Sequence, residues 1–297
     1  SMLLDYSELL NALDSGACAK ITINNRRLNG TDFQHSVLMR LKGDGLDKYR
    51  QEYNGILMEK AVESNNLIQD KYITISVERK NIEEARTFFK RVDIDLGKSF
   101  GKLDSGAKAL DNHERLRIFH DFFRPGEEQD FRIDLSEAMK RGHSFKDAIA
   151  PDGMQFKADH FEIGGKVGRV LFLREYASYI KDRMITDLSD FSRNLMLSID
   201  ILPVPTNEAI KEMQARILGV ESDITRWQQK QNANNNFTAT VPYELEQLRA
   251  ENKEFLDDLS TRDQRMMQAV LTLVITADTK QELDTDTEKI RSLSGRC

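Results

Sequence analysis

The sequence predicts an α+β fold, with two lobes of sheet covered by helices and a long antiparallel helical hairpin in the second lobe. A unit of strand, capped turn and amphipathic helix recurs from Tyr72, Leu195 and Val270. Repeated units of this kind favour sheets that are covered by helices. Residues 206–265, between the second and third units, contain two long segments with apolar residues at steps of three and four, which is typical of two helices that pair.

The first lobe, residues 1–128, should begin with a strand over Ala17–Ile23. Helices are expected around Asp32–Leu41 and Leu46–Ser64, followed by the strand from Tyr72 and its long helix. A helix over His113–Phe123 should end the lobe, with its inward residues being Leu116, Phe119 and Phe123.

The long helix after the strand from Tyr72 has clear signals at both ends. Asn81 should cap it, and Glu84 three residues later gives the capping-box arrangement. Gly97 should end it, since glycine is favoured just past helix C-termini. The residues whose helical spacing predicts the buried face are Ile82, Ala85, Phe89 and Val92.

The second lobe, residues 129–297, follows the polar segment Arg124–Gln129, which contains Pro and Gly and is therefore placed at the boundary. It should contain a strand hairpin within Phe156–Leu173 and a helix from Ser178 to about Phe191. The remaining expected elements are a strand alternating Leu195, Leu197, Ile199 and Ile201, a long helix capped by Thr206, its paired helix, a strand from Val270, and a final helix with Thr279 as cap and Glu282 three residues on.

The paired helices should each present a seam, meaning the stripe of residues through which two helices pack. The first seam comprises Ile210, Met213, Ile217, Val220, Ile224 and Trp227. The second comprises Leu245, Leu248, Asn252, Phe255 and Leu259, on a helix opened by Pro242. The Asn-rich connection from residue 231 to 241 is expected to be an exposed turn. Two interpretations stay open: ordinary packing within the lobe, or a protruding arm for a partner.

Composition describes a globular protein of 297 residues with 39% hydrophobic and 31% charged residues. The net charge of −6 disfavours a chain that grips nucleic acid through phosphates, because such proteins usually carry a basic surplus. Cys18 and Cys297 form no disulfide framework and suit a reducing cytosol. The longest apolar run, Ala269–Ile275, is far shorter than the roughly 20 residues that a spanning helix needs.

The tripeptide Gly97-Lys98-Ser99 matches the end of a nucleotide-binding phosphate loop. That motif requires a leading glycine at position 92, which is Val92, and it lies between a strand and a helix rather than at a helix end. The glycines within Ile163–Val170 precede an apolar run instead of opening a helix, so a hairpin turn is expected there rather than a dinucleotide site.

Other candidate sites are weak. His113-Glu114 lacks the second histidine of a zinc motif, since position 117 is Arg117. His120 lies among phenylalanines and is expected to be packed or solvated. Further groups considered are the pairs Asp257-Asp258 and Asp284/Asp286, expected on solvated helix faces, and Arg26-Arg27, a weak candidate for binding a phosphate or an acidic partner. We assign no catalytic, cofactor-binding or metal-binding residue.

Six segments resemble one region of a known family. They are residues 17–29, 45–60, 71–89, 165–184 and 195–209, and above all 261–284 (TRDQRMMQAVLTLVITADTKQELD). That family is the conjugal transfer ATPases of type IV secretion systems, the CagE/TrbE/VirB class, in the version carried by Gram-positive conjugative elements. The resemblance implies a non-catalytic domain that precedes an ATP- and Mg-dependent motor domain, which lies beyond Cys297.

The resemblance further implies a chain at the inner face of the cell membrane, held there by membrane components of the secretion channel and by neighbouring motor subunits. Ser1 before Met2 and the abrupt end at Cys297 also lead us to expect a piece of a longer protein. The alternative function is a nucleic-acid-binding module that guides the transferred strand, and an enzyme of unrecognised chemistry ranks last.

Overall fold

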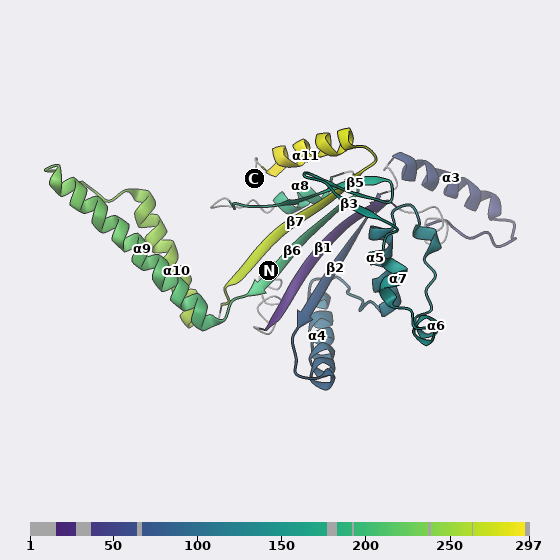
Figure 1. Cartoon of the computed structure of the whole chain (residues 1–297), viewed down its shortest axis with the longest axis horizontal. Coiled ribbons are helices and arrows are strands. Elements are labelled where there is room, and N and C mark those ends of the chain that lie inside the picture. The colour runs from purple at the N-terminus through teal and green to yellow at the C-terminus, as the bar shows by residue number, and fades with distance from the viewer. Residues whose placement is uncertain are drawn as a thin grey trace. The chain divides into compact units, whose positions relative to one another are not determined.

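A computed structural model describes residues 16–27, 37–63, 67–176, 183–191, 193–236, 239–262 and 264–294. Within these ranges seven strands form one antiparallel sheet in the order β2-β1-β6-β7-β5-β4-β3 (Figure 1). The strands are β1 (Ala17–Arg27), β2 (Leu67–Val77), β3 (Met154–Phe156), β4 (Phe161–Ile163), β5 (Lys166–Phe172), β6 (Leu195–Pro203) and β7 (Met267–Ala277).

The helices of the described residues differ widely in length. They are α3 (Asp47–Glu63), α4 (Ile82–Lys102), α5 (Asn112–Phe123), α6 (Leu135–Lys140), α7 (Phe145–Ile149), α8 (Arg183–Ser189), α9 (Thr206–Ala233), α10 (Tyr243–Thr261) and α11 (Lys280–Ser294), with a short 3-10 turn, η1 (Glu128–Asp130). The prediction of an α+β fold is therefore confirmed.

The strands lie in a single sheet rather than in one sheet for each lobe, because β1 pairs with β6 across a large separation in sequence. The chain divides into two compact units, whose limits fall within β1, β2, β6 and β7 and between α4 and α5. One unit comprises the described residues of 1–19, 75–107 and 200–269, and the other comprises those of 20–74, 108–199 and 270–297. The domain boundary between residues 128 and 129 stays a prediction.

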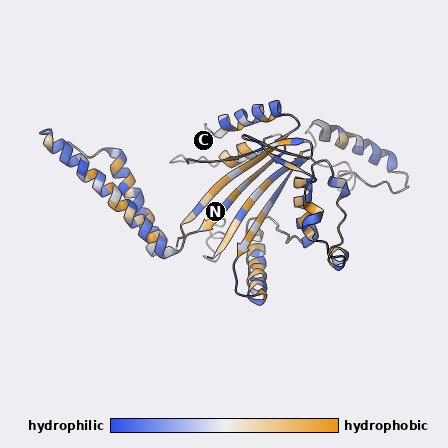
Figure 2. Cartoon of the chain, in the orientation of Figure 1, coloured by the Kyte–Doolittle hydropathy of each residue, from blue (hydrophilic) through white to orange (hydrophobic). Residues whose placement is uncertain are grey.

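The core of the second unit lies between the central strands and two helices, α8 and α11. Alternate residues of β6 and β7 point toward this core, as the period-two pattern predicts. In Figure 2 the long strands show orange residues interspersed with blue ones, while α11 is blue over much of its visible surface. The buried members of the cluster are Ile23, Met184, Leu188, Leu195, Leu197, Leu271, Leu273, Ile275, Leu283 and Ile290.

Buried Asn25 connects β1 to the end of α8. Its amide nitrogen donates to the carbonyl oxygens of Ser189, at 2.5 Å, and Phe191, at 3.1 Å. Its side-chain oxygen accepts a 3.2 Å hydrogen bond from Gln69 of β2. Because a buried amide must be hydrogen-bonded to be tolerated, these contacts position α8 against the sheet.

Several predicted helix ends are confirmed. The side chain of Asn81 accepts a 2.9 Å hydrogen bond from the backbone N–H of Glu84 at the start of α4. Thr279 accepts a 3.3 Å bond from the backbone N–H of Glu282 at the start of α11. Thr206 was expected as a cap, but Pro205 occupies that position and Thr206 is the first residue of α9.

Other expectations are wrong in the described residues. Residues 37–41 are not helical; the side chain of Asn54 instead exchanges hydrogen bonds with the backbone of Met39 at 2.8 and 2.9 Å. Phe119 of α5 is 39% exposed, whereas Leu116 and His120 are buried. The other expected helix residues, 32–36 and 178–182, lie outside the described part of the chain, as does Cys297.

The buried face of α4 also differs from the prediction. Phe88 is 5% exposed, while Ile82 is 66% and Phe89 is 43% exposed. The guanidinium of Arg79 lies 4.7 Å from the centre of the Phe88 ring, so a cation covers this aromatic residue. The stripe that includes Ile82 and Phe89 therefore faces outward among the described residues.

Candidate functional site

The tripeptide Gly97-Lys98-Ser99 lies within α4, which continues to Lys102. Gly97 was expected to end the helix, and this is wrong, because Leu103 is the C-cap and its N–H bonds the carbonyl oxygens of Gly101 and Phe100. The backbone N–H groups of this stretch lie in a helix interior and do not form the strand–loop–helix cradle of a phosphate site.

The glycine stretch forms the turn that was expected. Gly164 and Gly165 have φ angles of 52° and 72° and connect β4 to β5, with Ile163 opposite Lys166. Two consecutive positive φ angles match the two-residue hairpin turn, which glycine tolerates without strain. The side chain of Phe161 fills the space beside Gly168, so that this glycine allows close packing.

The two histidines of α5 lie against one aromatic ring. The ring centres of His113 and His120 lie 4.9 and 5.0 Å from that of Phe131. His120 is 3% exposed, and its Nδ1 lies 3.3 Å from Asp121 Oδ1. His120 is therefore a packed histidine, one of the two readings that the sequence allowed, while burial raises the pKa of Asp121.

Arg26 forms an ion pair with a carboxylate of the neighbouring strand. Its Nε lies 2.7 Å from Asp70 Oδ2, across β1 and β2. Burial alone lowers the pKa of Arg26, but the hydrogen bond and charge of Asp70 raise it further, so the net shift is upward. Burial, together with the charge of Asp70, raises the pKa of Tyr72 to about 12. Arg26 thus stabilises the strand pair from within.

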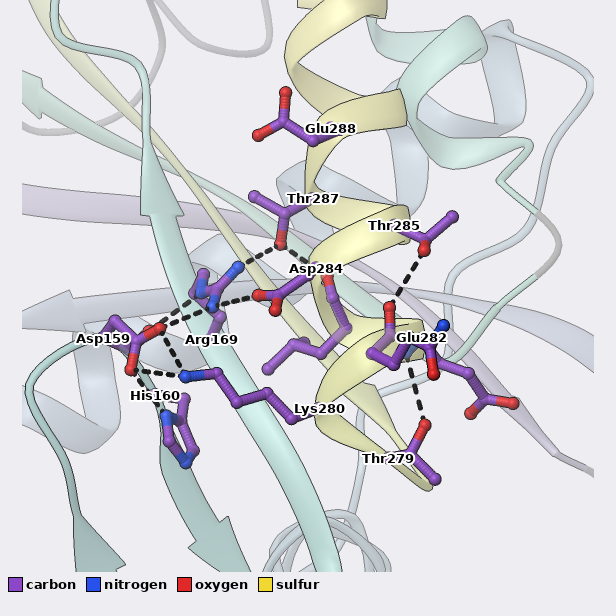
Figure 3. Close-up of polar contacts among 12 residues, drawn as sticks. Asp159, His160, Arg169, Thr279, Lys280, Glu282, Asp284, Thr285, Thr287 and Glu288 are labelled. Atoms are coloured by element: carbon purple, nitrogen blue, oxygen red, sulfur yellow. Dashed lines mark hydrogen bonds and ion pairs between the residues drawn. The ribbon is translucent and has the colours of Figure 1, made fainter.

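A cluster of charges connects the turn between β3 and β4 to β5 and α11 (Figure 3). Arg169 of β5 donates to the carbonyl oxygen of Asp159 at 2.8 Å, to Asp284 at 2.7 Å and to the hydroxyl of Thr287 at 2.8 Å. Lys280 Nζ lies 3.1 Å from Asp159 Oδ2. These bonds cross-link three elements of the same compact unit.

The carboxylate of Asp159 is held in its charged form. A 2.7 Å hydrogen bond with His160 and a contact with Lys280 lower its pKa to about 2. Because Asp159 and Asp284 are already matched by Arg169 and Lys280, the cluster supplies structural ion pairs rather than a free acid or base. The sequence reasoning missed it, since its members come from three distant segments.

Asp286 corrects a prediction. It was expected on a solvated helix face, but it is 3% exposed. Its Oδ2 lies 3.3 Å from Arg193 Nε, and its Oδ1 lies 3.6 Å from Lys289 Nζ. The helical turn of α11 that carries Asp286 faces α8 and the sheet, so this carboxylate is buried where Asp284 is not.

No catalytic constellation emerges from these groups in the described residues. No three His, Cys, Asp or Glu side chains there converge as a metal-binding group. Among the same residues, no helix has both the length and the apolar character to cross a membrane. The remaining candidate is the pair formed by α9 and α10.

Helices α9 and α10 have 28 and 19 residues and run antiparallel, side by side (Figure 1). Their base is fixed by a 2.9 Å hydrogen bond from the N–H of Val204 to the carbonyl oxygen of Met266. A cluster of apolar residues fills the base: Ala209, Met213, Leu259 and Met266 are buried, and Val204, Ile210 and Leu256 pack against them. The predicted helical hairpin is therefore present.

The seam of α9 is confirmed, with Met213, Val220 and Ile224 buried. The seam of α10 is confirmed in part, because Leu259 is buried and Leu245 and Asn252 are half-buried. Two of its predicted members are wrong: Leu248 is 44% and Phe255 is 36% exposed, and Leu256 packs into the base cluster instead of Phe255. Polar contacts replace part of the expected apolar seam. Glu221 of α9 lies 3.8 Å from Arg249 and 3.5 Å from Lys253 of α10.

Four large apolar residues of α9 and α10 are exposed in the described part of the chain. They are Leu218, at 71% exposure, Tyr243, at 76%, and the flanking Leu248 and Phe255. Asn234 to Asn236, at the end of α9, are exposed as predicted, whereas residues 237 and 238 lie outside the described residues. Exposed apolar residues on one element are typical of a contact surface for another molecule.

Comparison with known proteins adds no family: no family model and no curated protein matches this chain. The resemblance drawn from the sequence segments therefore stays a prediction.

Proposed function

We propose that this chain is the non-catalytic N-terminal domain of a type IV secretion or conjugation motor ATPase, and that the α9–α10 hairpin is its docking arm. One observation carries the proposal. The hairpin is a pair of helices that pack on each other over an apolar base. It exposes the side chains of Leu218, at 71%, and Tyr243, at 76%. Exposed aromatic and aliphatic residues are the usual anchors of protein interfaces.

The partners in this proposal are membrane components of the secretion channel and neighbouring motor subunits, which would hold the chain at the inner face of the membrane. ATP hydrolysis belongs to the motor domain that the resemblance places after Cys297. The surfaces of α9 and α10 carry positive and negative side chains together, which favours a protein partner over a nucleic acid backbone. Arg216 pairs with Glu212 at 2.6 Å, and Arg262 pairs with Asp258 at 2.8 Å, so these cations are partly neutralised.

The test uses the full-length protein in cells that carry the conjugative element. We expect Leu218→Asp to reduce DNA transfer at least tenfold, because a charge at an interface anchor costs roughly 2 kcal/mol or more. Leu218 is exposed, so the variant should keep its circular dichroism spectrum and its denaturation midpoint. Phe156→Asp is the matched control, since Phe156 of β3 is 76% exposed and lies far from α9 in sequence.

The two variants and the wild type are also compared by cross-linking to the membrane fraction. Loss of membrane-protein cross-links for Leu218→Asp alone supports the docking arm. Equal transfer by both variants and the wild type would reject it. Sub-micromolar DNA binding by the chain, with a steep dependence on salt, would instead support the nucleic-acid-binding alternative.

A further inference from the structure

Helix α4 has an outer apolar face that is exposed within the described part of the chain. On its inner side Phe88 is buried and Val92 is half-buried, whereas on the outer side Ile82 is 66% and Phe89 is 43% exposed. An open hollow of about 460 Å³ follows this outer side. The residues that line the hollow define the outer face: Ile82, Ala85, Arg86, Phe89, Lys90 and Asp93. Large apolar side chains that gather on one exposed face are typical of a contact surface.

The charged residues of the outer face carry both signs and are weakly engaged within the chain. Arg86 lies 3.9 Å from Glu83, and both side chains are largely exposed, so this pair contributes little to stability. Asp93 forms no ion pair with any other described residue. Asp93 follows Arg86 by seven residues, which places it on the same side of the helix, two turns further on.

We propose that α4 packs against α4 of a second copy of this chain, with the two helices antiparallel about a two-fold axis beside Phe89. In a two-fold interface each contact occurs twice, because residue i of one copy meets residue j of the other and j meets i. A face can pair with itself in this way only if its two ends are complementary. The outer face meets this condition through Arg86 at one end and Asp93 at the other.

One register satisfies both the charges and the apolar residues. When Arg86 lies opposite Asp93 of the second copy, Phe89 lies beside Phe89 of that copy, near the axis. Paired aromatic rings stabilise a contact beyond the area that they bury. A shift of one helical turn in either direction separates Arg86 from Asp93 of the second copy. The two charge pairs therefore select this register, since opposite charges across an interface fix its orientation.

Gly97 has a role in this arrangement that the single chain does not give it. A Cβ on Gly97 would meet nothing within 4 Å, although glycine in the interior of a helix is destabilising. In the register with Arg86 opposite Asp93, Gly97 lies opposite Ile82 of the second copy. The missing side chain leaves room for Ile82, so the two helix backbones can approach closely.

The size of the contact predicts its strength. An interface made by one helix from each copy belongs to the weak class, which buries less than about 1,200 Å² in total. We therefore expect reversible association with a dissociation constant in the micromolar range. The inference goes beyond the proposed docking arm, because it concerns a different helix and does not depend on the partner of α9 and α10.

Sedimentation velocity of the full chain over a series of concentrations tests the proposal. We expect the wild-type chain to convert from monomer to dimer as its concentration rises. Arg86→Glu should weaken the dimer at least about tenfold, because each Asp93 then faces a carboxylate. Asp93→Arg should weaken it to a similar extent, because each Arg86 then faces a second guanidinium. Both positions are exposed, so the circular dichroism spectra and denaturation midpoints should stay unchanged.

Mixing the two variants gives the sharpest test. In a pair made of one Arg86→Glu chain and one Asp93→Arg chain, the new glutamate faces the new arginine and the original Asp93 faces the original Arg86. The mixture should therefore associate at least about tenfold more tightly than either variant alone. A single chain with both substitutions should recover the wild-type dissociation constant for the same reason.

Phe89→Asp and Ile94→Asp form a matched pair of variants on the same helix. Ile94 is 57% exposed but does not line the hollow, so Ile94→Asp should leave the dissociation constant unchanged. Phe89→Asp should weaken the dimer at least about tenfold, because it places two carboxylates beside the axis. Leu218→Asp, the variant that tests the docking arm, should have no effect on self-association.

Four outcomes would overturn the proposal. One is a wild-type chain that stays monomeric at concentrations of about 1 mM. Another is a mixture of Arg86→Glu and Asp93→Arg that associates no better than either variant alone. The third is equal weakening by Phe89→Asp and Ile94→Asp. The last is a dimer that Leu218→Asp disrupts and Phe89→Asp does not, since this would assign self-association to α9 and α10.

Discussion

Removing Arg193 should destabilise the fold much more than neutralising its partner, Asp286. The carboxylate of Asp286 is 4% exposed, whereas the guanidinium side chain of Arg193 is 43% exposed. Arg193→Met leaves a buried charge whose nearest remaining cation is Lys289, at 3.6 Å. Asp286→Asn leaves Arg193, which water can solvate.

The magnitudes follow from the geometry. At the observed 3.3 Å and an effective dielectric constant of about 20, the gross attraction of this pair is on the order of 5 kcal/mol. The cost of removing the carboxylate from water offsets most of it. Arg193→Met removes the attraction but leaves the desolvation cost of the Asp286 carboxylate, so the free energy of unfolding should fall by about 3 kcal/mol. Asp286→Asn removes both the attraction and the desolvation cost, so the free energy of unfolding should fall by about 1 kcal/mol or less.

Urea denaturation followed by circular dichroism measures these values, and the double variant should be more stable than Arg193→Met alone. Arg291→Met is the control, because Arg291 pairs with Glu288 at 65% and 71% exposure on the same helix and should lose less than about 0.5 kcal/mol. The reasoning fails if Arg193→Met costs no more than Arg291→Met, or if Asp286→Asn costs more than Arg193→Met.

Three further predictions use other parts of the chain. Met213 is 1% exposed at the base of the hairpin, and Met213→Ala should lower the free energy of unfolding by about 2–5 kcal/mol. A decrease below about 1 kcal/mol would contradict its burial. Gly168→Ala should destabilise the fold by about 1–3 kcal/mol, because its Cβ would lie 2.2 Å from the ring of Phe161 on the neighbouring strand. Gly219→Ala should stabilise the fold by up to about 1 kcal/mol, because Gly219 lies within α9 and a Cβ there would meet open space. The pKa of Asp159 is lowered from 3.8 to about 2, so its ion pairs stabilise the fold above about pH 4 and are lost as the pH falls toward 2. His160→Ala should raise this pKa in an NMR titration. An unchanged pKa would show that His160 is not the main cause of the shift.

Local signals predicted the elements well. The alternation of Leu195 and Leu197 predicted their burial in β6, and the Asn81 cap predicted the start of α4. Both signals depend only on neighbours in sequence, where periodicity and cap chemistry act. The order of the strands depends on pairings such as that of β1 with β6, which no local pattern contains. For this reason the sequence predicted two sheets where the structure has one.

The charged groups were harder to predict for the same reason. Asp284 and Asp286 lie two residues apart on α11, and both belong to a polar pattern. Only the fold shows that Arg193, some ninety positions earlier in the chain, pairs with the buried one, while Arg169 pairs with the exposed one. In the hairpin, likewise, Leu256 takes the place predicted for Phe255 in the base while Leu259 keeps its predicted place, and a shift of one position is smaller than a periodic pattern resolves.

The wrong face of α4 has a different physical origin. Ile82, Ala85 and Phe89 do recur at helical spacing, and the pattern was therefore real. Periodicity shows that a stripe is apolar and says nothing of which molecule or segment covers it. Two apolar stripes on one helix require two covers, and the described residues supply one of them at Phe88.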